Sequence, residues 1–399
     1  MNLPPTDSAH PFVQLYQWIA HPIDYITRNA NRYGEQFCAR LGNLNKFYFL
    51  SNPADIERVF TANPDEFDAG RANWILRPTV GDYSLLLLDG ALHKRHRQLL
   101  MPPFHGERMK AYGQTICEIT KQVVNQWQVG QPFVTRSAIQ EISLNVILQA
   151  VFGLYEGDRF VRLRQLIDDF LQFTTSRLGF TMAFFPLLQQ DYGAWSPGGK
   201  FLRMLKQIDD ELYAEIQERR SHPDEERTDI LSLLLSARDE DGQPMTDVEI
   251  RDELITLLIA GHETTATAIT WALYWMHLLP EVKTKLLAEL ATLGDNPDFA
   301  AITRLPYLNA VCSETLRIYP VVVITFLRIT KNTFQVGDYT YPPESTLAPC
   351  IYLVHRRADV YPEPEKFKPE RFLERQFSPY EFFPFGGSNR RCIGAAFAL

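Results

Sequence analysis

The sequence predicts a mainly α-helical fold with small β-sheets, and three observations support this class. Between about 106 and 290, apolar residues recur at three- and four-residue spacing, as in 139–152, 160–173 and 201–216. An apolar period of two occurs only in a few short segments. With 399 residues, of which 45% are hydrophobic and 22% charged, the chain can bury a large core. We therefore expect a globular protein in which helices dominate.

Short strands are expected near the start of the chain and again in its last quarter. Segments 37–41 and 47–50 are apolar and are joined by a Gly-Asn-Leu-Asn turn, which is typical of a hairpin. Apolar residues alternate in 321–330 and in 334–341, and a Gly-Asp pair divides the second of these. These segments predict small sheets beside the helices.

A long helix is expected through the core. Thr246 is followed three residues later by Glu249, a pattern typical of a helix start. From Leu254 to Pro280 the only formally charged residue is Glu263. A carboxylate near the centre of a membrane span costs about 2.5–3.5 kcal/mol, so we interpret this segment as a helix buried on all faces in a protein core.

Charge and cysteine usage exclude several classes of protein. A net charge of -8 argues against a nucleic-acid-binding protein. The five cysteines never form a C-x-x-C pair, which excludes a zinc ribbon and a dense disulfide framework. The first residues lack the pattern of a signal peptide. We therefore expect a cytoplasmic protein without a transmembrane anchor.

The most informative motif is the segment Pro-Phe-Gly-Gly-Ser-Asn-Arg-Arg-Cys-Ile-Gly at 384–394. Its cysteine, Cys392, has glycines on both sides and two arginines directly before it. Glycines allow backbone N–H groups to turn toward the sulfur, and the neighbouring cations favour the thiolate. We interpret Cys392 as a metal-binding thiolate, with a buried structural cysteine as the alternative.

The centre of the long helix carries a second motif, Ala-Gly-His-Glu-Thr-Thr at 260–265. Gly261 weakens the helix, and a threonine hydroxyl can bond to the carbonyl four residues earlier, so together they could open a groove over a ligand. A kink with satisfied polar groups is the alternative. A zinc-protease H-E-x-x-H motif is excluded, because its second histidine would fall at Ala266.

Two further sets of charged residues have helical spacing. Glu314 and Arg317 share a helix face between apolar neighbours, and Arg371 is a candidate third member of a buried ion cluster. His93 and Arg97 also share a face, as donors to a carboxylate would. A solvated basic face is the alternative for that second pair.

In this order and at these separations, the motifs resemble those of the cytochrome P450 family of haem-thiolate monooxygenases. The matching patterns are Phe385-Gly-x-x-x-Arg390-x-Cys392-x-Gly394 for the haem loop, 260–265 for the oxygen-activation helix, and Glu314-x-x-Arg317 with Pro369-x-Arg371-Phe372 for a structural triad. The resemblance covers essentially the whole chain, and is greatest to bacterial soluble members related to fatty-acid and alkane hydroxylases. It implies the cytochrome P450 fold, a triangular helical prism with a long central helix over the haem.

The resemblance also implies a role for each matched residue, with heme b (iron protoporphyrin IX) as the cofactor. Cys392 would be the thiolate on the iron, Phe385 would pack against the haem, and Gly394 belongs to the same loop. Glu263 and Thr264 would relay protons to dioxygen. The haem propionates would be bound by His93, Arg97, Arg328 and Arg390. The structural triad would consist of Glu314, Arg317 and Arg371.

Two features depart from the family pattern. Ser388 stands where the family usually has a second glycine. Only Ile393 to Leu399 follow the thiolate, whereas the family continues through a helix beneath the haem and a terminal hairpin. We therefore expect 1–399 to be a single, C-terminally truncated cytochrome P450 domain that lacks the segment after the haem-loop cysteine.

The implied reaction inserts one atom of dioxygen into a lipophilic substrate, such as a fatty acid, an alkane or a terpenoid, with electrons from NAD(P)H. The sequence has no dinucleotide-binding fingerprint, so a ferredoxin with its reductase, or a flavodoxin, is expected as electron donor. A docking face for an acidic ferredoxin would be formed by Lys94, Arg95, Arg390 and Arg391. A peroxide-driven peroxygenase and a non-catalytic haem-binding or gas-sensing protein are the alternatives. We expect a monomer, and leave peripheral contact with membranes open.

No motif fixes the substrate contacts. By analogy with the family, the pocket would draw on 73–88, 173–186, 258–264 and 321–326. The apolar members of these segments include Phe180, Phe184, Phe185, Val322, Val323 and Phe326. Ordinary core packing is the alternative for each of them.

Overall fold

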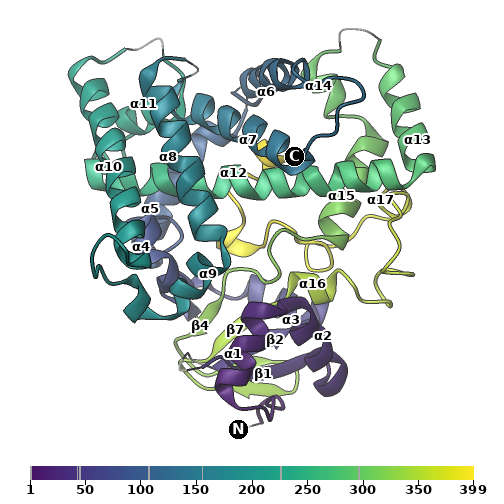
Figure 1. Ribbon diagram of the computed structural model, residues 1–399. Helices are drawn as coiled ribbons and strands as arrows, with labels where there is room; N and C mark the ends of the chain where they lie inside the picture. Colours follow the sequence, from purple (N-terminus) through teal and green to yellow (C-terminus); the bar gives the residue numbers. More distant parts are fainter. Residues whose placement is uncertain are drawn as a thin grey trace. The chain divides into compact units, whose positions relative to one another are not determined.

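The computed structural model describes residues 2–42, 44, 46–106, 108–154, 156–224, 227–294 and 297–399, without the side chains of Phe180 and Pro186. Two residues of the expected hairpin turn, Asn43 and Asn45, lie outside the described residues. Helices dominate and the sheets are small, so the predicted fold class is confirmed (Figure 1). The chain divides into two compact units, one of Met1–Ala72, Thr267–Ala395 and Leu399, and the other of Asn73–Ala266 with Ala396–Ala398. The single domain expected for 1–399 stays a prediction.

The first unit contains a five-stranded sheet, a two-stranded hairpin and the helices around them. The strands are β1 (Gln36–Arg40), β2 (Lys46–Leu50), β3 (Phe67–Asp68), β4 (Arg328–Thr330), β5 (Phe334–Val336), β6 (Tyr339–Tyr341) and β7 (Thr346–Pro349). The helices are α1 (Pro11–Ala20), α2 (Pro22–Tyr33), α3 (Pro53–Thr61), α13 (Pro280–Ala291), α14 (Phe299–Ile302), α15 (Pro306–Ile318), α16 (Ile351–Val354) and α17 (Arg371–Glu374), with 3-10 turns at Pro64–Glu66 and Ser388–Arg390.

Among the described residues of the second unit, the regular elements are all helices. Its helices are α4 (Arg77–Val80), α5 (Gly90–Leu100), α6 (Arg108–Val124), α7 (Thr135–Phe152), α8 (Asp158–Thr175), α9 (Arg177–Phe184), α10 (Pro197–Ser221) and α11 (Ile230–Ser236), with 3-10 turns at Pro102–Phe104 and Pro186–Gln189. Three segments hold residues of both units: α12 (Asp247–Leu278), the short α18 (Ala395–Ala398) and the 3-10 turn Arg71–Leu76.

The large sheet joins strands that lie far apart in the sequence. Its order is β1-β2-β7-β4-β3, with β1 antiparallel to β2 and β2 parallel to β7, where Tyr48 lies opposite Leu347. In Figure 1 the purple N-terminal strands therefore lie beside the yellow-green β7. One core cluster fills the space between this sheet, β5–β6 and α3, and includes Phe60 and Phe383. The segment that leads to Cys392 thus begins in the core of the first unit.

Both hairpins predicted from the sequence are present. β1 and β2 pair in register from Gln36 opposite Leu50 to Arg40 opposite Lys46. β5 and β6 form the second hairpin, whose turn holds Gly337 at a φ of 57°, a left-handed conformation that favours glycine.

The strand predicted over 321–330 is wrong for most of its length, because only Arg328–Thr330 forms β4. Arg328 lies opposite Leu347, and β7 ends at Pro349, so most of 321–327 extends beyond the end of the strand it could join. That segment makes isolated bonds instead, from Thr325 N–H to the Pro349 carbonyl at 2.9 Å and from Tyr352 N–H to the Val323 carbonyl at 3.1 Å.

The predicted long helix is α12, which is continuous over 32 residues. It opens with a reciprocal capping box: Glu249 N–H donates to Thr246 Oγ1 at 3.2 Å, and Thr246 N–H donates to Glu249 Oε2 at 2.7 Å. These bonds satisfy donors that a helix start leaves without partners. Among the described residues, no helix has the length and apolarity needed to cross a membrane.

Candidate functional site

The residues predicted for the site are divided between the two units. The first unit holds Glu314, Arg317, Arg328, Arg371, Phe385, Arg390, Cys392 and Gly394. The second unit holds His93, Arg97, Glu263 and Thr264.

Cys392 ends a tightly closed loop. Cys392 N–H donates to the Phe385 carbonyl at 2.9 Å, and Gly386 N–H donates to the Phe383 carbonyl at 2.9 Å. Gly386 has a φ of 67° and Ser388 a φ of 60°. Because left-handed backbone favours glycine, the φ of Ser388 gives a physical reason why the family usually has glycine at this position. Of the five cysteines, Cys392 alone has an exposed side chain.

Gly387 brings this loop against α3. A Cβ at Gly387 would lie only 2.3 Å from Cδ2 of Phe60, so a larger residue would force the loop away from the helix. Phe60 in turn packs edge-on against Phe383, with ring centroids 5.7 Å apart. At Gly394, by contrast, the space that a Cβ would take is open.

Two of the arginines expected to bind propionates are buried in the first unit. Arg328 is 3% exposed, and its Nη1 donates to the Phe326 carbonyl at 2.8 Å. Arg390 is 6% exposed and lies within the cysteine loop. Arg390 is therefore not a surface cation of the described chain, whereas its neighbour Arg391 is exposed.

The structure brings Glu314, Arg317 and Arg371 together, and we call them the α15 cluster. Arg317 donates to Glu314 twice, from Nε at 2.6 Å and from Nη2 at 2.8 Å. Arg371 Nε and Lys368 N–H donate to the same carboxylate at 3.1 and 2.8 Å. Glu314 and Arg317 have no exposed surface, yet this carboxylate accepts four bonds, which offset the cost of burying charge.

His355, which the sequence did not single out, links the α15 cluster to the cysteine loop. Arg317 Nη1 donates to the His355 carbonyl at 2.8 Å, and Phe383 N–H donates to its ring Nε2 at 3.1 Å. Burial, reinforced by the charge of Arg317, lowers the pKa of His355 to about 3. The ring is therefore neutral at physiological pH.

In the second unit, α5 carries His93 and Arg97 one turn apart. His93 is buried and Arg97 is half-buried. Their neighbour Arg95 donates to Asp239 at 2.6 Å and to Glu249 at 2.8 Å. Arg95 is thus engaged within its own unit, and the ferredoxin docking face expected to include it stays a prediction.

His96 forms, with Glu249 and Glu253, what we call the α5–α12 cluster. Its ring Nδ1 lies 2.8 Å from Glu253 Oε1 and its Nε2 lies 3.2 Å from Glu249 Oε1. A ring nitrogen without a proton would oppose a carboxylate lone pair, so the cluster holds one proton more than a neutral ring and two carboxylates would. Glu253, whose pKa is raised by burial, is a group that can hold this proton.

The environment of the two carboxyl groups fits this sharing. Burial raises the pKa of Glu253, and His96 only partly opposes that shift. For Glu249, burial would also raise the pKa, but bonds from Thr246 and the charge of Arg95 outweigh it, so its pKa is lowered.

The motif in the middle of α12 packs against α7. Thr264 Oγ1 donates to the Ala260 carbonyl at 2.6 Å, as the sequence led us to expect. A Cβ at Gly261 would lie 2.7 Å from Cδ1 of Ile147, so this glycine allows the two helices to approach closely. α12 continues without interruption through this segment.

Glu263 is directed at α7 by two polar side chains. Gln140 Nε2 donates to Glu263 Oε2 at 2.9 Å, and Arg136 forms an ion pair with the other carboxylate oxygen. The neighbouring His262 is buried, and its Nε2 lies 3.1 Å from the Gln140 carbonyl. Burial lowers the pKa of His262, which favours its neutral ring. Within this motif, Glu263 is the residue that pairs with the cation Arg136.

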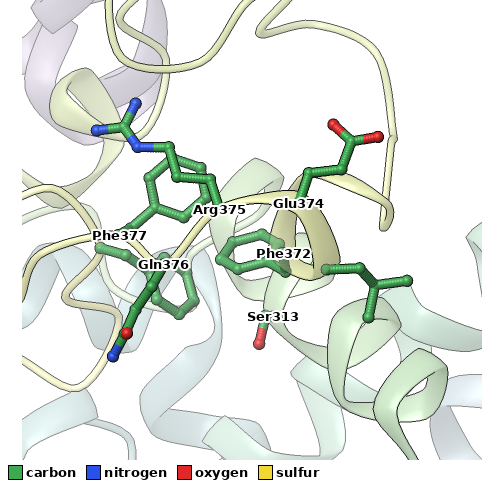
Figure 2. A pocket seen from close by; sticks show the side chains of 8 residues that line it. Ser313, Phe372, Glu374, Arg375, Gln376 and Phe377 are labelled. Carbon is green, nitrogen blue, oxygen red and sulfur yellow. The ribbon is translucent and has the colours of Figure 1, made fainter.

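A surface depression of about 360 Å³ lies in the first unit, where α15 and α17 meet (Figure 2). The residues that line it include Phe372 and Phe377, with their rings, and Ser313 of α15. Arg375, on its rim, donates to Glu381 at 2.5 Å. None of the residues predicted for the site lines this depression, and we do not assign it to the substrate.

The residues expected to contact substrate include several that the chain leaves open to solvent. Phe185 is 39% exposed and Val322 is 47% exposed. The side chain of Phe180 lies outside the described residues. Apolar side chains with this much exposure are available to contact a lipophilic molecule, whereas a fully buried side chain serves core packing.

Comparison with known proteins identifies the family. A family model described as Cytochrome P450 matches residues 4–399. A Mycobacterium tuberculosis protein assigned as cytochrome P450 135B1 is 38% identical over 402 residues, which cover 100% of this chain and 82% of that protein. Another from the same organism, assigned as cytochrome P450 138, is 34% identical and is covered to 86%.

Two solved structures share the fold. The retinoic-acid-bound cyanobacterial CYP120A1 has a TM-score of 0.87 at 24% identity, over 100% of this chain and 89% of that one. The cytochrome P450DA heme domain has a TM-score of 0.84 at 21% identity, over 100% of this chain and 88% of that one. The predicted cytochrome P450 fold is confirmed.

Proposed function

The chain belongs to the cytochrome P450 family, whose members are oxygen-incorporating oxidoreductases that bind haem through a cysteine thiolate, and we propose that Cys392 is that ligand. The observation that carries the proposal is that Cys392 is exposed at the end of a closed loop, directly after Arg390 and Arg391 in the sequence. Neighbouring cations favour the thiolate, which is the form that binds a metal. The donor set therefore fits the haem.

When bound, haem supplies the binding and activation of dioxygen. The side chains proposed to hold its propionates are basic and buried or half-buried, so their bonds to carboxylates are charge-assisted and weakly screened by water. These four side chains are His93, Arg97, Arg328 and Arg390.

Thr264 and Glu263 are proposed to move the protons that oxygen reduction consumes. Thr264 Oγ1 is a donor that can exchange its bond to the Ala260 carbonyl for one to water. Glu263 supplies a carboxyl group, a type of side chain that can pass protons on, and its carboxylate is held by Arg136.

The proposed substrate is lipophilic, a fatty acid, an alkane or a terpenoid, because the segments expected to contact it expose apolar side chains such as Phe185 and Val322. The proposed electron donor is a ferredoxin with its reductase, or a flavodoxin. Of the four cations proposed for its docking face, Lys94, Arg95, Arg390 and Arg391, the first and the last are exposed.

The decisive experiment is the absorption spectrum of the reduced, carbon-monoxide-bound protein. A strongly red-shifted Soret band that is lost in Cys392→Ser supports the thiolate, and an unshifted band in the wild type would overturn it. Thr264→Ala should then keep the band but consume NAD(P)H without forming product. Binding of each substrate class is measured as a change in the spectrum of the oxidised haem.

Two alternatives are tested in the same preparation. A peroxygenase would turn over faster with hydrogen peroxide than with the ferredoxin system. A haem-binding or gas-sensing protein would show the red-shifted band without reductase-dependent consumption of dioxygen. Either result would replace the monooxygenase proposal.

A further inference from the structure

His355 lies between the α15 cluster and the loop that carries Cys392. It directly follows α16 and has no exposed surface. Its carbonyl accepts from Arg317 Nη1 at 2.8 Å, and its ring accepts from Phe383 N–H at 3.1 Å. One residue thus contacts both the buried ion pair and the segment before the cysteine loop.

Aromatic neighbours hold the ring in one orientation. Phe382 stacks on it, with ring centroids 5.3 Å apart and planes inclined by 28°. Phe383 and Tyr361 approach it edge-on, at 5.4 and 6.3 Å. A ring enclosed in this way has little freedom to rotate, so the direction of its nitrogen lone pair is fixed.

The protonation of the ring follows from its donor. Because Phe383 N–H donates to Nε2, that nitrogen keeps its lone pair and the proton of the neutral ring is on Nδ1. The charge of Arg317 and the complete burial of His355 both favour the neutral ring. His355 is therefore a permanent acceptor at physiological pH.

Hydrogen bonds continue from Phe383 into the loop. The Phe383 carbonyl accepts from Gly386 N–H at 2.9 Å, and the Phe385 carbonyl accepts from Cys392 N–H at 2.9 Å. A displacement of Phe383 would therefore shift the turn on which Cys392 depends for its position.

We propose that His355 is a positioning residue for the Cys392 thiolate: its ring fixes Phe383, and with it the cysteine loop, to the buried Arg317. The inference rests on the proposed role of Cys392 as haem ligand and adds the residue that holds this ligand in place. His355 itself does not touch the reacting atoms.

Two substitutions separate the roles of the ring. His355→Gln keeps an acceptor for Phe383 N–H but loses the stacking on Phe382, whereas His355→Phe keeps the stacking and loses the acceptor. His277→Phe is the control, because His277 is exposed and lies in the same unit.

The first measurement is the Soret band of the reduced, carbon-monoxide-bound variants. We expect His355→Phe to bind haem but lose most of the red-shifted band in favour of an unshifted one, while His355→Gln and the control retain it. Equal bands in His355→Phe and the wild type would overturn the proposal.

The second measurement does not depend on haem. In His355→Phe, backbone amide exchange at Phe383, Gly386 and Cys392 should be about tenfold faster, as expected when a buried hydrogen bond is lost, with α15 unchanged. Unchanged amide exchange in the loop of His355→Phe would contradict the positioning role of His355, whatever the spectrum of the wild type. The absence of a red-shifted band in the wild type would refute only the role of Cys392 as haem ligand.

The third measurement needs no variant, and covers the case in which His355→Phe does not fold. The 15N resonance of His355 Nε2 in the wild type should be that of an unprotonated nitrogen that accepts a hydrogen bond. A protonated Nε2 would overturn the proposal, because it could not accept from Phe383 N–H.

Discussion

His355 and His96 are both completely buried, but their neighbours place opposite demands on the ring. His355 accepts a backbone N–H and lies beside the guanidinium of Arg317. His96 lies between two carboxylates. Burial alone therefore does not describe the environment of a histidine, because one of these rings faces a donor and a cation while the other faces two acceptors.

The two regions should consequently respond to pH in opposite directions. The α15 cluster holds two arginines, which stay charged at all relevant pH values, and its neighbour His355 has a neutral ring that gains a proton in acid. The α5–α12 cluster depends on a proton that it can lose. Acid should destabilise the first region, and alkali the second.

The largest effect is expected from removing the carboxylate of the α15 cluster. Glu314→Ala would leave Arg317 and Arg371 without their shared acceptor in a buried site. A lost partner of a buried charge costs about 3–5 kcal/mol, so the free energy of unfolding in urea should fall by that amount or the protein should fail to fold. Glu374→Ala, at an exposed position in α17, is the control. A cost below about 1 kcal/mol would show that the cluster is not energetically important.

The next effect concerns acid and His355. Its folded pKa of about 3 lies below the ordinary value of 6.5, so the unfolded chain binds the proton first and stability is lost as pH falls below 6.5. From pH 6.5 to 5 this group should remove about 2 kcal/mol from the free energy of unfolding. His355→Gln should lack this loss and the exposed control His277→Gln should retain it, in urea unfolding across that range. Parallel curves for wild type and His355→Gln would contradict the assignment.

A smaller effect of opposite sign is expected for Glu253. In the folded protein the pKa of Glu253 is raised above the ordinary value of 4.5. Its contribution to the free energy of unfolding is therefore complete below pH 4.5 and is lost as the pH rises through the folded pKa. Within that window the loss is about 1.4 kcal/mol per pH unit. Glu253→Gln has no proton to release, so its free energy of unfolding should depend less on pH than that of the wild type or of Glu240→Gln, an exposed control. No difference in slope would mean that Glu253 does not share the proton.

The smallest effect is expected for an exposed ion pair, and it tests whether burial makes the α15 and α5–α12 clusters energetically important. Arg136, with 46% of its side chain exposed, pairs with Glu263. Arg136→Ala should cost less than about 1 kcal/mol and leave the pH dependence of unfolding unchanged. A cost above about 2 kcal/mol would place this pair with the buried clusters.

The sequence predicted what depends on local pattern. Helical spacing located α7, α8 and α10, a helix-start pattern before a nearly uncharged run located α12, and the turn residues located both hairpins. Glu314 and Arg317 share a helix, so three-residue spacing was enough to pair them. The strand expected over 321–327 failed because its partner strand ends too early, a fact set by the position of α16 rather than by the segment itself.

The sequence did not predict the partners of the two buried histidines. His355 receives its bond from a residue 28 positions away, and His96 meets carboxylates 153 and 157 positions away. No spacing rule links residues at such separations. His96 lies in the same basic segment as His93 and Arg97. The sequence pattern paired those two, because they are four residues apart and share a helix face.

The mixed sheet of the first unit has a consequence for how the chain folds during synthesis. β2 pairs with β7, about 300 residues later, while the second unit consists of the continuous stretch 73–266 and only Ala396–Ala398 besides. Contacts between such distant segments form slowly, and domains tend to fold as they leave the ribosome. The middle of the chain can therefore fold first, with β1 and β2 waiting as an exposed hairpin until β7 is made. That interval is when the apolar face of this hairpin is most open to aggregation or to a chaperone.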